Sequence, residues 1–214
     1  PHSRLLVNGI VEAPTRLQCY NESMHDTGLV LSGGGARGAY QAGALKGIAE
    51  IIKARTPFRI LTGVSAGALN SMYLAARADD FVNATDELYK TWKSVTPEKV
   101  YRTDVGSLAK ISGHWLKELG LGGAHTGINA NYLLDTSPLH ENLVGQIDMD
   151  AITHFFHSHT LRGVAVSATN YKTGTAVTFF DGAPEIKPWV RSTRLGVRAP
   201  VRHEHIMGSS AIPL

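Results

Sequence analysis

Two glycine-rich turns hold the residues of this sequence whose types and spacing could perform chemistry. Residues 33–38 read Gly-Gly-Gly-Ala-Arg-Gly after a short apolar run, and residues 63–67 read Gly-Val-Ser-Ala-Gly after another. A glycine-rich turn that opens into a helix can direct backbone N–H groups at an anion. A serine with glycines two positions before and after it can occupy the tip of a sharp strand-to-helix turn. Together the two turns indicate hydrolysis by a serine nucleophile.

Ser65 is the candidate nucleophile. When its hydroxyl attacks an ester carbonyl, negative charge develops on the carbonyl oxygen, and backbone N–H groups of the first turn would stabilise that charge. Arg37 either holds this turn, favours an anionic head group nearby, or forms only a local surface pair. The candidate oxyanion residues are Gly33, Gly34, Gly35, Arg37 and Gly38, and the turn around the nucleophile consists of Gly63, Val64, Ala66 and Gly67.

The first turn also satisfies the G-x-G-x-x-G pattern of dinucleotide-binding proteins. That interpretation requires an acidic residue about twenty positions further on, at the end of the next strand, to bind a ribose. Here the next predicted strand is followed by Gly63, Val64 and Ser65 instead. The sequence therefore favours an oxyanion site over a nucleotide site.

The segments around the two turns predict an α/β fold. Residues 27–32 and 58–62 are predicted strands, and the first is apolar on both faces, which is typical of a central strand in a parallel sheet. Repetition of strand, glycine turn and helix predicts a three-layer α/β/α domain with a mostly parallel central sheet. The other predictions are helices over 39–53, 68–77 and 79–93, an amphipathic segment over 107–121, a helix starting within 135–139, and strands over 163–169 and 176–180 joined by a turn at 170–174.

Length, composition and charge set limits on the function. The 214 residues suit one domain, over 27–214, with an N-terminal extension over 1–26. A net charge of +3 without a basic run argues against nucleic acid as a partner. Cys19 is the only cysteine, so no intrachain disulfide can form. With neither a signal-peptide core nor a membrane-length apolar stretch, we expect a soluble, cytoplasmic protein that meets any lipid substrate from the aqueous side.

The order of these motifs resembles that of bacterial patatin-like phospholipases, from Thr27 to the end of the sequence. The resemblance implies hydrolysis of phospholipid or other lipid esters, of phospholipase A or lysophospholipase type, during transient contact with a membrane surface. It further implies a Ser–Asp dyad without histidine, metal or cofactor, and the glycine loop as oxyanion hole. The segments that carry it are residues 31–40, 63–67, 135–139, 165–170 and 209–213.

The position of the dyad aspartate departs from the pattern of that family. There it lies in an Asp-Gly-Gly or Asp-Gly-Ala motif after a Ser-Ala-Ile-Pro segment, whereas this sequence stops at Leu214, directly after that segment. Asp181 begins an Asp-Gly-Ala triplet, but it precedes the segment, and we interpret it as a turn residue. We therefore expect the catalytic aspartate, with the C-terminal part of the domain, to be missing from these 214 residues. If they are the whole molecule, we expect weak activity or none.

Two alternatives to the dyad enzyme stay open at this point, a Ser-His-Asp esterase and a binding module without turnover. Ser65, Asp181 and either His203 or His205 follow the chain order of a Ser-His-Asp esterase. A metal site at the two histidines would need a strand to place both rings on one face, and no third ligand is identifiable. A protein that kept the fold without turnover would be a lipid- or partner-binding module. Residues 107–127, with Trp115, Leu116, Leu119 and Leu121, are either a lipid-facing lid or a helix packed on the domain.

Overall fold

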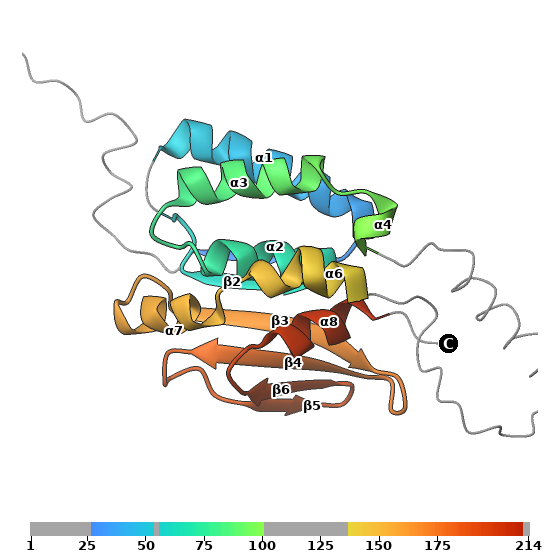
Figure 1. The fold of residues 1–214 in the computed structure, drawn as a ribbon. Coiled ribbons are helices and arrows are strands. Elements are labelled where there is room, and N and C mark those ends of the chain that lie inside the picture. The colour runs from blue at the N-terminus through green and yellow to red at the C-terminus, as the bar shows by residue number, and fades with distance from the viewer. Residues whose placement is uncertain (1–26, 54–55, 101–136, 212–214) are drawn as a thin grey trace, which may run out of the picture.

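The computed structural model describes residues 27–53, 56–100 and 137–211 of the chain, and these form one six-stranded sheet flanked by helices (Figure 1). The strand order is β1-β2-β3-β4-β6-β5. The strands are β1 (Gly28–Leu31), β2 (Ile60–Val64), β3 (Gly163–Asn170), β4 (Thr175–Gly182), β5 (Trp189–Arg191) and β6 (Arg194–Arg198).

The sheet is mixed. Strands β1, β2 and β3 run parallel, as do β4 and β6, whereas the β3–β4 and β5–β6 pairs are antiparallel. The predicted turn at 170–174 is confirmed as the hairpin between β3 and β4, which pair from Gly163↔Gly182 to Asn170↔Thr175. Because β1 and β2 are parallel neighbours, the two glycine turns follow their carboxyl ends on the same side of the sheet.

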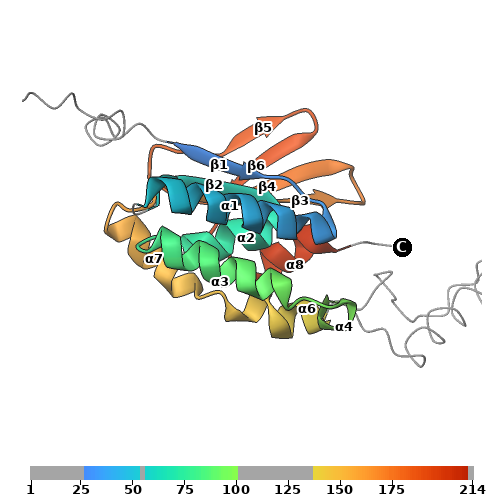
Figure 2. The same ribbon diagram turned by 90° about the horizontal axis from the view of Figure 1, so that it is seen from above.

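The helices lie mainly in two groups. Helices α2 and α8 pack against the sheet, and α1 and α3 pack on each other and on α2 (Figure 2). This arrangement is consistent with the predicted three-layer α/β/α fold. The helices are α1 (Gly38–Ile52), α2 (Ala66–Ala75), α3 (Phe81–Lys93), α4 (Pro97–Val100), α6 (Ser137–Asn142), α7 (Met149–His157) and α8 (His203–Ser210), with short 3-10 turns η2 (Gly35–Arg37) and η3 (Val144–Gln146).

Helix α2 lies at the centre of the core and is buried from Gly67 to Ala75. A helix that is enclosed on all sides must be apolar around its whole circumference, and the sequence AGALNSMYLA nearly meets that requirement. Its small residues let the sheet, α1 and α3 approach closely. The fold thus uses its most enclosed helix to carry the segment that follows Ser65.

Several element boundaries differ from the predictions. Strand β2 runs to Val64 and α2 begins at Ala66, so Ser65 alone separates them. Helix α3 begins at Phe81 rather than at residue 79, because the Asp80 side chain accepts a hydrogen bond from the backbone N–H of Asn83 and caps the helix there. Asp181, interpreted as a turn residue, instead lies within β4.

Some predictions fall on residues that the structure does not describe. These are the extension over 1–26 and the candidate lid over 107–127. Among the described helices, none has the length and apolar character required to cross a bilayer.

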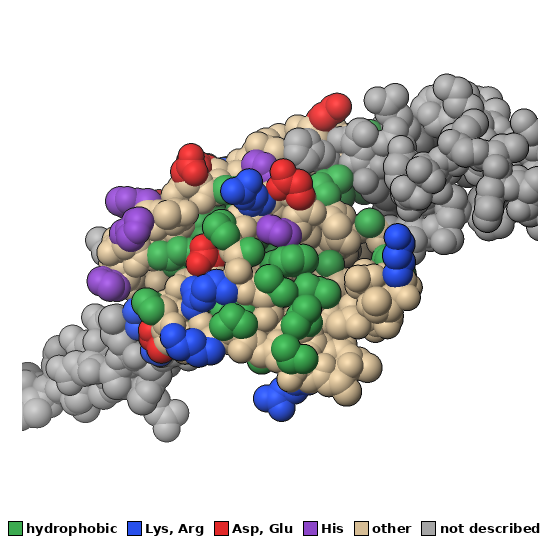
Figure 3. Space-filling view, turned by 90° about the horizontal axis from the view of Figure 1, so that it is seen from below, with side chains coloured by type: hydrophobic (Ala, Val, Ile, Leu, Met, Phe, Trp, Pro, Cys, Tyr) green, Lys and Arg blue, Asp and Glu red, His purple; other side chains and the backbone are tan. Residues whose placement is uncertain are grey.

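Strands β5 and β6 lie at the bottom of Figure 1. The view from below shows hydrophobic side chains near the middle of that face (Figure 3). Val190 of β5 is among the most exposed apolar residues of the described chain.

Candidate active site

Ser65 occupies a strained turn between β2 and α2. Its φ of 53° and ψ of −123° lie in a region that residues other than glycine rarely adopt. Its carbonyl accepts hydrogen bonds from the N–H groups of Ala68 and Leu69, which begin the first turn of α2. This is the geometry of a nucleophile elbow, in which the serine hydroxyl is presented at the tip of the bend.

The two flanking glycines are required because the backbone approaches itself closely on both sides of Ser65. A Cβ atom on Gly63 would lie 2.2 Å from the carbonyl oxygen of Gly67. A Cβ atom on Gly67 would lie 2.2 Å from the carbonyl oxygen of Leu31, at the end of β1. Only hydrogen fits at either position, so this spacing of glycines is a steric condition for the elbow.

The glycine loop lies directly beside Ser65. A Cβ atom on Gly33 would be 3.3 Å from the Cβ of Ser65, and Gly35 adopts a φ of 53°, which favours glycine. The loop leads through η2 into α1, whose first N–H groups have no partner within the helix and lie at the positive end of its dipole. The structure therefore brings together the two turns that the sequence predicts to act together.

The individual residues of the loop lie in different positions relative to Ser65. Gly35 and Ala36 line the cavity that contains Ser65, whereas Arg37 is exposed and outside the residues that line it. Gly38 is buried at the start of α1, where a Cβ atom would lie 2.3 Å from the ring of Trp92. The helical spacing of α3 indicates Trp92 only as a core residue, whereas the structure places it on the wall of the Ser65 cavity.

A buried amide fixes both ends of the glycine loop. Asn70 of α2 is fully buried, and its Nδ2 donates to the carbonyl of Gly38 (3.1 Å) and to Oε1 of Gln41 (3.0 Å). Gln41 Nε2 in turn donates to the carbonyl of Ser32 (2.8 Å), just before the loop, and Asn70 Oδ1 accepts from Trp92 Nε1 (2.6 Å). An amide side chain in a largely apolar, alanine-rich helix is the signal by which the sequence could have identified Asn70.

We expect Asn70→Leu to lower the free energy of unfolding by about 1–3 kcal/mol, because it removes a donor from the Gly38 carbonyl and leaves the part-buried indole N–H of Trp92 without its acceptor. Urea denaturation measures the change. The matched control is Asn83→Leu on the exposed face of α3, which should stay within about 0.5 kcal/mol of the parent. Equal stabilities for the two variants would contradict the role given to Asn70.

The cavity beside Ser65 has a volume of about 600 Å³ and is mainly apolar. It opens between the elbow, α3 and the neighbouring helices α4 and α6. Among the described residues that line it, none is acidic, basic or a histidine. Such a cavity suits an acyl chain better than a charged ligand. The larger apolar side chains that line it are Leu69, Trp92, Val95, Val100, Leu139 and Leu143.

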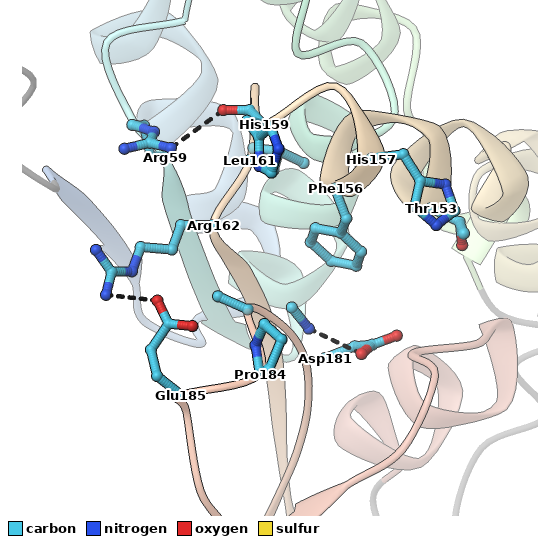
Figure 4. A pocket seen from close by; sticks show the side chains of 12 residues that line it. Arg59, Thr153, Phe156, His157, His159, Leu161, Arg162, Asp181, Pro184 and Glu185 are labelled. Carbon is cyan, nitrogen blue, oxygen red and sulfur yellow. Dashed lines mark hydrogen bonds and ion pairs between the residues drawn. The ribbon is translucent and has the colours of Figure 1, made fainter.

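Asp181 lies at the other end of the sheet from Ser65. It pairs with Val164 near the start of β3, whereas Val64, the neighbour of Ser65, pairs with Ser167 further along the same strand. Its carboxylate accepts from the N–H of Gly182 (2.8 Å) and lies 3.6 Å from Arg198. Asp181 lines a second, separate cavity of about 510 Å³ (Figure 4). The structure does not bring Asp181 and Ser65 together.

The two histidines are likewise separate from the cavity that contains Ser65. Nε2 of His203 lies 2.8 Å from the carbonyl of Ile147, and Nδ1 of His205 accepts from the N–H of Arg202. The His205 ring packs against Phe179, and burial lowers the pKa of His205 below its ordinary value. Both lie on helix α8, where i, i+2 spacing points the side chains apart. Among the described residues, no group of three potential ligands could hold a metal ion.

Comparison with known protein families agrees with this geometry. A family model described as patatin-like phospholipase matches residues 29–214, which include both glycine turns, the cavity and α8. Neither the curated proteins nor the solved structures yielded a match. The matched residues make up most of the sequence, and the chain therefore belongs to the patatin-like phospholipase family.

Proposed function

We propose that this protein is a serine lipid acyl hydrolase of the phospholipase A or lysophospholipase type, with Ser65 as its nucleophile. Membership of the family indicates lipid ester hydrolysis. The observation that carries the more specific proposal is the position of Ser65, which lies at positive φ, beside the glycine loop, on the wall of an apolar cavity. The proposed nucleophile, the oxyanion donors and the space for an acyl chain thus all lie at the carboxyl ends of β1 and β2.

In the proposed reaction, the hydroxyl oxygen of Ser65 attacks the ester carbonyl carbon while the acyl chain lies against Leu69 and Trp92. N–H groups of the glycine loop, at Gly34, Gly35 and neighbouring positions, stabilise the oxyanion, and one such donor typically contributes about 2.7–4 kcal/mol. Collapse of the intermediate releases the alcohol and leaves an acyl-enzyme. Water then hydrolyses this ester and regenerates the free serine.

A base must accept the proton of Ser65 in this mechanism. The described residues that line the cavity include no acid, and Asp181 lies at the opposite end of the sheet. We therefore propose that the base is an aspartate outside the described residues, as the Ser–Asp dyad implied by the family resemblance requires. The reaction as proposed needs no metal or organic cofactor.

We also propose that the protein contacts a membrane surface transiently. Tyr40 adjoins the glycine loop and is 82% exposed, and Val64, next to the nucleophile, is also exposed. An exposed tyrosine suits the boundary between water and lipid, because its ring is apolar and its hydroxyl is polar. Both residues are sequence neighbours of residues that line the cavity, Ala39 and Ser65.

The test combines active-site labelling with turnover. The protein is treated with a fluorophosphonate, the modified residue is mapped by mass spectrometry, and fatty acid release from phosphatidylcholine and lysophosphatidylcholine vesicles is measured. We expect labelling at Ser65 and release of fatty acid. A protein that binds the vesicles but is neither labelled nor active would instead be a lipid-binding module.

A double variant separates the proposed dyad from a Ser-His-Asp triad. We expect His203→Gln together with His205→Gln to keep kcat within about threefold of the parent, because neither ring lies in the cavity with Ser65. The measurement is fatty acid release under saturating substrate. Loss of about a hundredfold or more, in a variant whose melting temperature is unchanged, would show that a histidine acts as the base.

A further inference from the structure

The backbone N–H of Ser65 is held by a side chain from the far end of the described chain. Ser209, in the last turn of α8, accepts this N–H at its Oγ at 2.7 Å. The same Oγ donates its own proton to the carbonyl of Ser167 in β3 at 2.6 Å. The hydroxyl proton is therefore directed at β3, and a lone pair faces the nucleophile.

This contact satisfies a group that the local backbone leaves without a partner. Ser65 is the N-cap residue of α2, and the first N–H groups of a helix have no acceptor within the helix. Strained backbone persists only where the surrounding structure fixes it in several ways. Glycines 63 and 67 give the elbow room to form, whereas the Ser209 hydroxyl ties its tip to β3 and α8.

We propose that Ser209 is a positioning residue that holds the backbone of the nucleophile in its reactive conformation. This inference rests on the proposed function of Ser65. Ser209 acts through Ser65 and not as a base, because its hydroxyl proton is bonded to Ser167 and its acceptor side is bonded to the Ser65 N–H. Removing the hydroxyl should therefore reduce the rate of the chemical step more than the binding of substrate.

We expect Ser209→Ala to lower kcat by about tenfold to a hundredfold and to change KM by less than about threefold. Ser209→Thr keeps the hydroxyl and should restore kcat to within about threefold of the parent. Ser209→Cys keeps the shape with a weaker acceptor, and should fall between the two. The matched control is Ser158→Ala, because Ser158 also bonds a backbone carbonyl at the end of a helix and lies outside the Ser65 cavity.

Two further readouts distinguish positioning from general stability. The rate constant for fluorophosphonate labelling of Ser65 should follow kcat across the variants. Hydrogen exchange of the Ser65 amide, measured by NMR, should accelerate in Ser209→Ala and not in Ser158→Ala, because the N–H has lost its acceptor. Variants are compared at matched fractions folded, judged from their unfolding curves.

The outcomes separate this inference from the proposed function. An active parent whose kcat and Ser65 amide exchange are unchanged by Ser209→Ala overturns the inference and leaves the function standing. A fall in kcat that threonine does not restore also overturns it. A parent without turnover counts against the proposed function, and the exchange measurement then decides alone whether Ser209 holds the elbow.

Discussion

Replacing Ser65 with alanine is expected to lower the hydrolysis of lipid esters by about 10⁴-fold or more, because removal of a nucleophile leaves only the contributions of the oxyanion site and substrate binding. The substitution deletes one oxygen and leaves the turn, the glycine loop and the cavity in place. Fatty acid release at saturating substrate measures the effect. Fluorophosphonate labelling should be lost at the same time.

The control for this variant is a second serine that lies elsewhere. Ser158→Ala at the end of α7 should keep both turnover and labelling. Unfolding curves of the two variants should match that of the parent within about 0.5 kcal/mol, since neither change creates a cavity in the core. Turnover that survives in Ser65→Ala would show that another nucleophile carries the reaction, and the assignment of the elbow would then be wrong.

Gly67→Ala is expected to destabilise the protein by about 3 kcal/mol or more, at the upper end of the usual range for overpacking. The added Cβ would lie 2.2 Å from the carbonyl oxygen of Leu31 and 2.6 Å from that of Ser32. Both contacts are to backbone, so no rotamer change can relieve them. Relief requires β1 to move away from α2, and β1 leads directly into the glycine loop, so activity should fall together with stability.

A glycine elsewhere in the fold provides the comparison for Gly67. Gly43, in the middle of α1, has no atom within 4 Å of an added Cβ, apart from its own helix. Gly43→Ala should therefore stabilise the protein by about 0.5–1 kcal/mol, the ordinary gain from alanine in a helix. Urea denaturation of both variants is the measurement. Changes of the same sign at the two positions would contradict the steric account of the elbow.

The features that the sequence alone predicts are those encoded within a few residues of each other. The strands and helices around both glycine turns follow from apolar runs and glycine positions, and the β3–β4 hairpin follows from two runs of β-formers around residues 170–174. The pairing of the glycine loop with the elbow is also local, because each turn follows a strand and the two strands are neighbours. The local sequence pattern is therefore sufficient to predict that the glycine loop and the Ser65 turn lie side by side.

The remaining parts of the site depend on contacts between distant residues. Whether Asp181 could reach Ser65 depends on how the β3–β4 hairpin pairs with β2, a strand far away in the sequence. Ser209 contacts Ser65 across 144 positions of sequence. The link from Asn70 to Trp92 likewise depends on how α3 packs on α2. The sequence therefore predicts the proposed nucleophile and its loop, but not Asn70 and Ser209, which contact them.

The distance along the chain between Ser65 and Ser209 has a consequence for biosynthesis. Both glycine turns lie between β1 and α2, near the start of the described residues, whereas the hydroxyl that binds the Ser65 amide is in α8, near their end. A nascent chain that has emerged only through α3 has the serine but neither Ser167 nor Ser209 to hold it. The hydrogen bond to the Ser65 amide can form only after translation has passed α8, so an unfinished chain on the ribosome lacks this contact to the elbow.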